Sequence, residues 1–319
     1  MTGATGFVGG TVVNLLRARG DEVVALVRDP GRARHLADIG VELARGDVAD
    51  RATLAGPMAG ADGVFHLAGW YKLDDADRAA AWSTNVDGTR NVLDVMGELG
   101  IARGVYTSTL AVNSDTHGVE ADEDYRFAGT HLTTYDLTKA EAHRIASSRA
   151  ATGLPLVIVQ PGLVYGPGDT SPVRIQLRRF LAGRLPVVPS GTAYSWGHVE
   201  DIAAGHVTAM DRGRPGRRYI LCGSSHSVVE AMQVAGRVAG RRPPLVVPPV
   251  LLRPAIPVAG LLARVTRLPD GYSPDALRAS AGPTYLGTSA RARAELGFEP
   301  RPFEAGWSAT VEHELAETA

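Results

Sequence analysis

Apolar and polar residues change their periodicity several times along the first half of the chain. Apolar runs of strand length, such as Glu22–Val27 and Val64–Gly69, alternate with helical patterns such as Thr11–Arg19, as far as about Tyr165. Strands that alternate with helices predict a parallel sheet with helices on both faces. The pattern therefore predicts an α/β fold with a doubly wound parallel sheet.

The character of the sequence changes after Gly166. Prolines crowd the stretch from Pro243 to Pro257, and the C-terminal segment is rich in arginine and alanine. We therefore expect two parts. Residues 1–165, to which residues 194–222 return, form the sheet domain, and residues 166–193 and 223–319 form a smaller C-terminal lobe. A length of 319 residues agrees with such a second lobe.

The segment from Pro243 to Val265 raises the question of a membrane. It is apolar, but prolines and Arg253 interrupt it, and a spanning helix needs about 20 predominantly apolar residues. We expect no membrane span. The segment instead predicts a pair of helices that lines an apolar pocket in the C-terminal lobe, and attachment to a membrane surface is the alternative.

Composition and charge exclude several classes of function. The chain has 34 acidic and 33 basic residues and a formal net charge of −1, without a basic stripe for a nucleic-acid partner. The single cysteine, Cys222, lies in an apolar run and excludes an internal disulfide or a multi-cysteine metal site. The histidines have no metal-ligand spacing. No signal peptide opens the sequence, so we expect a cytoplasmic protein without a bound metal.

Tyr135 and Lys139 stand four residues apart in Tyr135–Ala151, a segment that predicts a helix with both side chains on one face. Only Lys72 and Lys139 among the 33 basic residues are lysines, and arginine does not replace lysine in proton chemistry. An ammonium beside a phenol is expected to favour the phenolate and to lower the tyrosine pKa. The pair therefore indicates proton transfer by Tyr135 with the help of Lys139.

A glycine pattern opens the chain, with Gly3, Gly6 and Gly9 in the order G-x-x-G-x-x-G before the expected helix. Small residues let the backbone approach a pyrophosphate, and a helix N-terminus supplies N–H groups to its oxygens. Such a loop normally follows a buried strand, yet it begins directly after Met1. We expect that the first strand is truncated, and that a chain extended upstream by about six residues is more stable.

Together these motifs resemble those of the extended short-chain dehydrogenase/reductase family, whose members include NAD-dependent epimerases and dehydratases. The resemblance covers essentially the whole chain, and further segments match in order: Gly46–Val48, Val64–Gly69, Asn85–Asn91, Val105–Thr109, Gln160–Asp169 and His198–Ala203. Within the family, the chain looks most like the dihydroflavonol-4-reductase and 3β-hydroxysteroid dehydrogenase branch. The resemblance implies a Rossmann-type cofactor domain over residues 1–165, a substrate-binding C-terminal lobe, and an NAD(P)-dependent oxidoreductase.

The resemblance also assigns roles to residues. Tyr135 would protonate the substrate oxygen, Lys139 would hold the nicotinamide ribose, and Thr109 would hydrogen-bond the same oxygen, with Ser108 as the alternative. Asn85 resembles an asparagine that supports this site, although a helix cap explains it equally well. The expected cofactor contacts are Gly3, Thr5, Gly6, Phe7, Val8, Gly9, Arg28, Asp47, Val48, Leu67, Ala68, Gly69, Thr107, Tyr135, Lys139, Pro161, Gly162, Leu163 and Val164.

The end of the second expected strand bears on the choice of cofactor. NAD-specific members place an acid there, which accepts from the ribose 2′-hydroxyl, but here Val27 occupies the position and Arg28 follows. Arginine pairs well with a 2′-phosphate. We therefore expect NADP as the cofactor. NAD is the alternative, because Asp29 could accept a hydrogen bond from the ribose 2′-hydroxyl.

The positions that mark sugar-nucleotide enzymes of the family hold other residues. Leu110 and Ala111 stand where dehydratases carry an Asp-Glu pair, and Leu163 stands where epimerases often carry an asparagine. We expect a small-molecule ketone, aldehyde or secondary alcohol of apolar or aromatic character, contacted by Tyr71, Ser108, Thr109, Tyr165 and Tyr194. The alternatives are an NAD-dependent sugar epimerase and a non-catalytic dinucleotide-binding sensor. A homodimer is compatible with the sequence.

Overall fold

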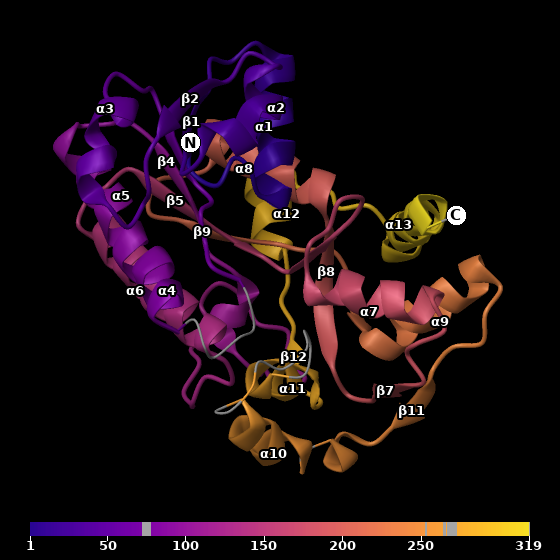
Figure 1. Cartoon of the computed structure of the whole chain (residues 1–319). Coiled ribbons are helices and arrows are strands. Elements are labelled where there is room, and N and C mark those ends of the chain that lie inside the picture. The colour runs from indigo at the N-terminus through magenta and orange to yellow at the C-terminus, as the bar shows by residue number, and fades with distance from the viewer. Residues whose placement is uncertain (72–77, 253, 264–265, 267–272, 319) are drawn as a thin grey trace.

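The computed structural model describes residues 1–71, 78–252, 254–263, 266 and 273–318 (Figure 1). Its main sheet is parallel throughout. One edge pairs β2 with β1, and the other part runs in the order β3, β4, β5, β9. The strands are β1 (Val24–Val27), β2 (Glu42–Arg45), β3 (Val64–His66), β4 (Gly104–Thr107), β5 (Leu156–Pro161) and β9 (Arg218–Leu221). The predicted doubly wound α/β fold is confirmed.

Met1 and Thr2 lie between the two parts of this sheet. The backbone N–H of Leu26 in β1 donates to the carbonyl of Met1, and the N–H of Thr2 donates to the carbonyl of Phe65 in β3, each over 2.9 Å. Thr2 forms isolated parallel bridges to both neighbours. These two residues therefore join β1 to β3 in the position where the sequence predicted a truncated strand.

Helices cover both faces of the sheet (Figure 1). Side chains alternate in direction along a strand, so Val105 of β4 packs into one core and Tyr106 into the other. The first core contains residues of α1 (Phe7–Arg19) and α8 (Val199–Arg212), and the second contains residues of α5 (Gly88–Glu98) and α6 (Thr134–Ala151). The remaining elements of this part are η1 (Pro30–Ala33), α2 (Arg34–Ala37), η2 (Arg51–Thr53), α3 (Ala55–Met58), α4 (Arg78–Trp82), the π-helix η4 (Ser83–Asp87) and η5 (Leu110–Asn113).

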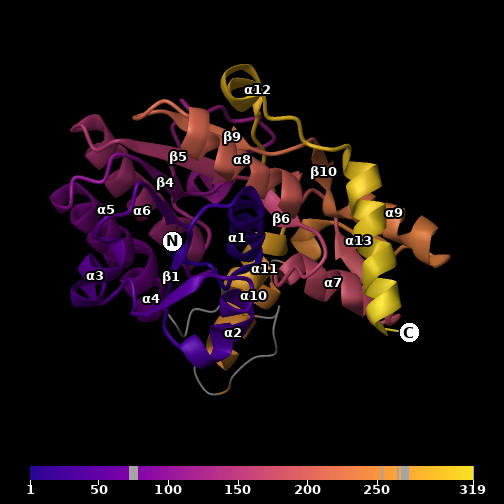
Figure 2. The same cartoon turned by 90° about the horizontal axis from the view of Figure 1, so that it is seen from above.

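A smaller lobe has its own aromatic core around Tyr165, Trp196, Phe303 and Trp307. In its mixed sheet β8 pairs with β6, β10 and β12. Strands β11 and β7 form a separate two-stranded sheet. The lobe elements are β6 (Leu163–Tyr165), α7 (Pro172–Leu181), β7 (Val187–Pro189), β8 (Ala193–His198), β10 (Ser225–Ser227), α9 (Val228–Ala239), β11 (Leu245–Val247), η6 (Pro249–Leu251), α10 (Ala255–Leu262), α11 (Pro274–Ser280), β12 (Thr284–Tyr285) and α13 (Phe303–Thr318). Figure 2 shows α13 alongside this lobe, beside α9.

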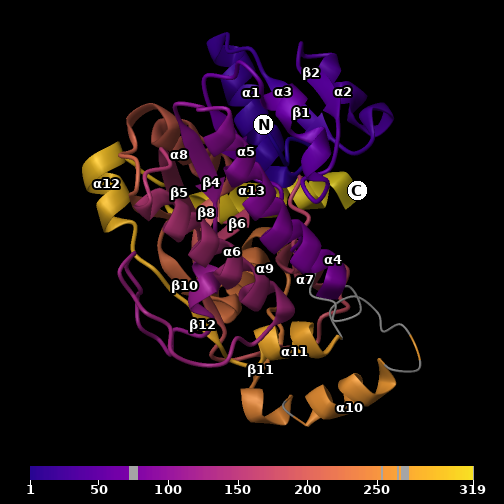
Figure 3. The same ribbon diagram turned by 90° about the vertical axis from the view of Figure 1, so that its left-hand side faces the viewer.

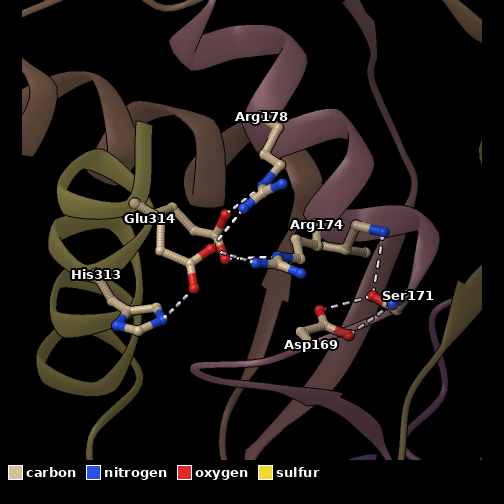
Figure 4. A network of polar contacts seen from close by, with 8 residues as sticks. Asp169, Ser171, Arg174, Arg178, His313 and Glu314 are labelled. Carbon is tan, nitrogen blue, oxygen red and sulfur yellow. Dashed lines mark hydrogen bonds and ion pairs between the residues drawn. The ribbon is translucent and has the colours of Figure 1, made fainter. Parts of the chain in front are cut away.

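Charged groups fasten α13 to α7 (Figure 4). The buried carboxylate of Glu314 accepts from the Nε atoms of Arg174 and Arg178, each over 2.6 Å. Asp169 accepts from the backbone N–H and the hydroxyl of Ser171, whose Oγ in turn caps the start of α7. Removing one partner of a buried ion pair is strongly destabilising because an unpaired charge remains, so this network fixes the C-terminal helix on the lobe.

The structure refines three sequence-based boundaries. The first helix begins at Phe7 rather than Thr11. Within residues 194–222, α8 and β9 return to the main sheet, whereas β8 belongs to the sheet of the lobe. Helix α12 (Ala290–Leu296) contributes Ala292 and Leu296 to the first core of the main sheet, although its residues were expected in the lobe. The division into cofactor and substrate parts stays a prediction.

The expected pair of helices between Pro243 and Val265 is only partly present. The described residues of this segment form β11, η6 and the single α-helix α10, which packs against α11 outside the segment. Leu261 and Val258 of α10 are exposed rather than lining a pocket. Within the described residues, no helix combines the length and apolar character needed to cross a bilayer.

Candidate active site

The backbone of the glycine loop packs so closely that a side chain has no room at Gly3 or Gly9. Gly3 has a φ of +75°, and a Cβ on it would lie 2.6 Å from the backbone nitrogen of Ala68. A Cβ on Gly9 would overlap the carbonyl oxygen of Gly3. Gly6 is the N-cap of α1, and no described side chain caps this helix. The first N–H groups of α1 therefore remain available to an anion, which fits a pyrophosphate.

Most residues that the sequence assigned to the cofactor follow the carboxyl ends of the main strands. Arg28 is exposed directly after β1, and Asp47 lies two residues beyond β2. Leu67, Ala68 and Gly69 follow β3, Thr107 ends β4, and Pro161 ends β5. Gly162 precedes β6, which contains Leu163 and Val164. Because parallel strands end at one edge of the sheet, these segments gather where open α/β sheets bind ligands. Val48 differs, because its side chain is buried in the core.

Thr109, Tyr135 and Lys139 come together between β4 and α6. The side chains of Thr109 and Tyr135 lie close enough for the Thr109 hydroxyl to influence the pKa of the tyrosine. The Nζ of Lys139 donates to the carbonyl of Thr107 over 2.8 Å and lies 5.0 Å from the ring centroid of Tyr106. Thr133 caps α6 by accepting from the N–H of Asp136. The helix start and the end of β4 therefore hold the phenol, the hydroxyl and the ammonium in one place.

The structure corrects the expected ionisation of this group. Desolvation raises the pKa of Tyr135 to about 12, and the Thr109 hydroxyl opposes the shift. Burial also lowers the pKa of Lys139 to about 7. The expectation that Lys139 lowers the tyrosine pKa treated the pair as hydrated, whereas burial disfavours the charged form of both groups. In this structure Tyr135 is therefore a protonated phenol at neutral pH.

Asn85 lies in the π-helix η4 and connects α6 to the loop after β3. Its Oδ1 accepts from the N–H of Trp70 over 2.7 Å, and its Nδ2 donates to the carbonyl of Trp70 and to Oγ1 of Thr138, each over 3.0 Å. Its side chain does not cap a helix, so the helix-cap interpretation is wrong. Single π-turns occur frequently at functional sites.

The residues that were expected to contact the substrate differ in their exposure to solvent. Tyr71 is exposed, and its hydroxyl lies 3.2 Å from that of Thr170. Ser108 is buried, and its Oγ lies 2.8 Å from Nδ1 of His143, which favours Thr109 as the hydroxyl of the site.

Two tyrosines expected at the substrate pocket belong to packed regions instead. Tyr165 is buried in the aromatic core, with its ring edge-to-face against Trp196 and Trp307. It is therefore not a substrate contact in this structure. Tyr194 is half-buried, stacks on Tyr285 and donates to the carbonyl of Ala279 over 3.3 Å, so packing and hydrogen bonding account for it.

A buried carboxylate next to Tyr135 was not anticipated. Asp136 accepts hydrogen bonds from Thr133 at 2.8 Å, from Ser114 at 3.0 Å and from Tyr285 of β12 at 3.2 Å. Ser114 has a φ of +46°, a region that non-glycine residues rarely adopt. Its hydroxyl also accepts from the N–H of Leu132. Asp136 therefore ties the start of α6 to the loop after β4 and to the C-terminal lobe.

Asp136 is expected to make stability depend on pH. Burial raises its pKa to about 6, compared with about 3.9 for a hydrated aspartate. The folded state therefore favours the protonated form, and stability is lost as the pH rises from about 4 through about 6. Asp136→Asn should remove this loss, so the variant should gain about 3 kcal/mol relative to the wild type over that range. Urea unfolding of the cofactor-free protein at several pH values measures this.

The control for this experiment is Asp62→Asn, which changes an exposed carboxylate. Its unfolding free energy should follow that of the wild type at every pH. A constant difference between Asp136→Asn and the wild type across the range would contradict the assignment of Asp136 as the titrating group.

Comparisons with known proteins show the family to which the chain belongs. The profile of the NAD dependent epimerase/dehydratase family matches residues 1–222. Sterol demethylase protein B of Methylococcus capsulatus is 30% identical over 318 residues, 98% of this chain and 96% of that protein. Cinnamoyl-CoA reductase 1 of Oryza sativa is 31% identical over 262 residues, 76% of each chain.

A solved structure extends the likeness of fold to the whole chain. The crystal structure of UDP-glucose 4-epimerase from Thermotoga maritima superposes with a TM-score of 0.78 at 19% identity, covering 100% of this chain and 98% of that one. At this identity the likeness concerns the fold alone. The family match and the relatives carry the assignment: the chain belongs to the NAD dependent epimerase/dehydratase family and is an NAD(P)-dependent enzyme of the extended short-chain dehydrogenase/reductase type.

Proposed function

We propose that the protein is an NADP-dependent reductase of ketones or aldehydes, acting in reverse on secondary alcohols. The observation that carries this proposal is the joint placement of Thr109, Tyr135 and Lys139 beside the end of β4, at the edge of the sheet where the glycine loop lies. A non-catalytic sensor would not need a buried lysine and a phenol–hydroxyl pair in this position.

The chain's own groups account for the proton chemistry. A bound nicotinamide dinucleotide supplies the hydride. Reduction leaves negative charge on the substrate oxygen, and Tyr135 donates its proton to that oxygen while Thr109 donates a second hydrogen bond to it. Lys139, held by the carbonyl of Thr107, binds the ribose and stabilises the phenolate that remains.

The preference for NADP is supported by the surroundings of Arg28. Arg28 is exposed at the carboxyl end of β1, and Arg32 and Arg34 are exposed on the following turn. Asp29, which could favour NAD, instead caps this turn: its Oδ1 accepts from the N–H of Gly31 over 2.9 Å. Guanidinium groups near a 2′-phosphate form charge-assisted hydrogen bonds.

Arg28→Ala is expected to weaken NADPH binding by roughly 10- to 150-fold, because a hydrogen bond to a charged group contributes about 1.5–3 kcal/mol. NADH, which lacks the 2′-phosphate, should be affected much less. Fluorescence titration of both cofactors measures the effect, with the exposed Arg214→Ala as the control. Equal losses for the two cofactors would remove Arg28 from the site, and tighter binding of NADH by the wild type would overturn the NADP preference.

An apolar or aromatic substrate is supported by two sequence positions and by the relatives. Leu163 lies in β6, packed against the aromatic core, where epimerases often carry an asparagine. Leu110 is buried, and Leu110–Ala111 carries no acid for dehydration. The relatives named above are a sterol demethylase protein and a cinnamoyl-CoA reductase.

The test is a panel of aliphatic, aromatic and steroidal carbonyl compounds in which NADPH absorbance is followed. Net consumption of NADPH with an apolar carbonyl compound supports the proposal. Interconversion of nucleotide sugars without net cofactor consumption would instead identify an epimerase.

A further inference from the structure

One end of the C-terminal lobe exposes large apolar side chains. Fourteen such residues are exposed in the described chain, and seven of them lie between residues 245 and 262, each 45–73% exposed. We call these seven the α10 patch: Leu245, Val246, Val250, Leu251, Val258, Leu261 and Leu262. Exposed apolar residues scattered singly are normal, whereas a group of them marks an interaction surface.

The patch is built from consecutive elements at one end of the molecule. Figures 1 and 3 both place β11 and α10 at the end of the molecule opposite to α1 and β1. On α10, Val258, Leu261 and Leu262 are spaced by three and four residues, which puts them on one face of the helix. The apolar face is therefore a surface feature of ordered elements rather than part of the lobe core.

The charge of this segment differs from that of the rest of the chain. No aspartate or glutamate occurs between Glu230 and Asp270, while six arginines do: Arg237, Arg241, Arg242, Arg253, Arg264 and Arg267. Arg241 and Arg242 are exposed directly before β11, and Arg237 pairs with Glu304. The last three are counted from the sequence alone, since they lie outside the described residues. In a chain with a net charge of −1, the patch is therefore apolar and locally basic.

This combination fits an anionic lipid surface better than a second copy of the chain. Apolar side chains with arginines beside them enter the headgroup region and attract acidic lipids. A symmetric contact between two copies would bring the same arginine-rich surfaces together, and like charges at an interface are unfavourable.

One helix, α11, links the patch to the helix of the candidate active site. Helix α10 packs against α11, and Asp275 of α11 accepts from the N–H of Thr134 at the start of α6 over 2.8 Å. The helix that carries Tyr135 and Lys139 is thus in direct contact with the neighbour of the apolar helix.

We propose that the α10 patch docks the protein on the surface of an anionic bilayer, with the apolar side chains in the headgroup region and Arg241 and Arg242 at the lipid phosphates. The helix lies on the membrane and does not cross it. This inference does not depend on the proposed reaction, because lipid binding can be measured without turnover.

The experiment is cosedimentation of the full chain with vesicles of phosphatidylcholine, alone or mixed with phosphatidylserine. We expect the chain to bind the mixed vesicles more tightly than pure phosphatidylcholine vesicles, by roughly fivefold or more for each arginine that contacts the lipid. Binding to the mixed vesicles should weaken as salt is added. Leu251→Ser combined with Leu261→Ser should lower the partition coefficient by about tenfold per leucine. Arg241→Gln combined with Arg242→Gln should lower binding to the mixed vesicles only.

The matched control is Leu15→Ser combined with Leu99→Ser, which makes the same changes at exposed leucines outside the patch and should leave binding unchanged. Circular dichroism checks that each variant is folded. If the Leu251/Leu261 double variant does not fold, the Arg241/Arg242 double variant decides the test. Absent binding, equal binding to both kinds of vesicle, or equal losses in control and patch variants would overturn the proposal. So would a wild-type dimer in solution that the Leu251 and Leu261 changes convert into a monomer.

Discussion

Tyr135→Phe is expected to lower kcat for carbonyl reduction by about 10²- to 10⁴-fold, the usual contribution of a positioned acid. The phenol hydroxyl, which lies near Thr109, is the group that we assign to the substrate oxygen, and phenylalanine removes only that hydroxyl. Cofactor affinity should change little, because the glycine loop and Lys139 provide the proposed cofactor contacts. Steady-state kinetics with the best substrate of the carbonyl panel, together with NADPH titration, measure both effects.

Tyr219→Phe is the matched control for this change. It also removes one tyrosine hydroxyl, which in this case donates to Glu295 of α12 over 2.9 Å on another part of the sheet. We expect this variant to keep the wild-type kcat. Wild-type turnover by Tyr135→Phe with any good substrate would show that the proton comes from another group.

The ionisation of Tyr135 gives the two directions of the reaction different pH dependences. With a pKa of about 12, the phenol carries its proton at neutral pH, which suits reduction. Oxidation of an alcohol requires the phenolate to accept a proton, so its rate should rise with pH over the alkaline range in which the protein remains folded. From the sequence, the charge of Lys139 was expected to lower the pKa of Tyr135. The structure gives a raised pKa because the folded chain desolvates the phenol, which the sequence could not show.

Local signals explain why much of the cofactor part was predictable. The order of Gly3, Gly6 and Gly9 reflects contacts within a few residues and with the neighbouring loop, as the overlap between Gly9 and Gly3 shows. The spacing of Tyr135 and Lys139 is a property of one helix. Such features depend on short-range geometry, so the residue types and their spacing suffice to predict them.

Contacts between distant segments explain what the sequence did not reveal. Asp136 directly follows Tyr135 in the sequence, where a helical aspartate usually faces solvent. It is buried because Ser114 and Tyr285 supply hydroxyls from 22 and 149 residues away. Tyr165 was expected to contact the substrate. Its burial depends on Trp196 and Trp307, which no local pattern connects to it.

Lys139→Arg is expected to be nearly as damaging as Lys139→Ala, with kcat/KM lowered by roughly 10- to 150-fold. The ammonium is buried, and its Nζ donates to the carbonyl of Thr107 over 2.8 Å. A Cβ placed on Gly69 would lie only 3.9 Å from Nζ. A planar guanidinium with five donors cannot reproduce the geometry of a point charge, so retaining the positive charge does not preserve the function.

The pH dependence of cofactor binding separates charge from shape in this experiment. Burial lowers the pKa of Lys139 to about 7, so the wild-type lysine loses its positive charge as the pH rises through about 7. The wild-type protein should therefore lose part of its affinity for the cofactor over the same range. The arginine variant remains charged and should bind weakly without this step. NADPH titration across that range tests the difference, with the exposed Arg45→Lys as a control for Arg-to-Lys exchange elsewhere. Normal turnover and a wild-type pH profile in Lys139→Arg would mean that Lys139 is a structural cation, and that proton transfer by Tyr135 does not require it.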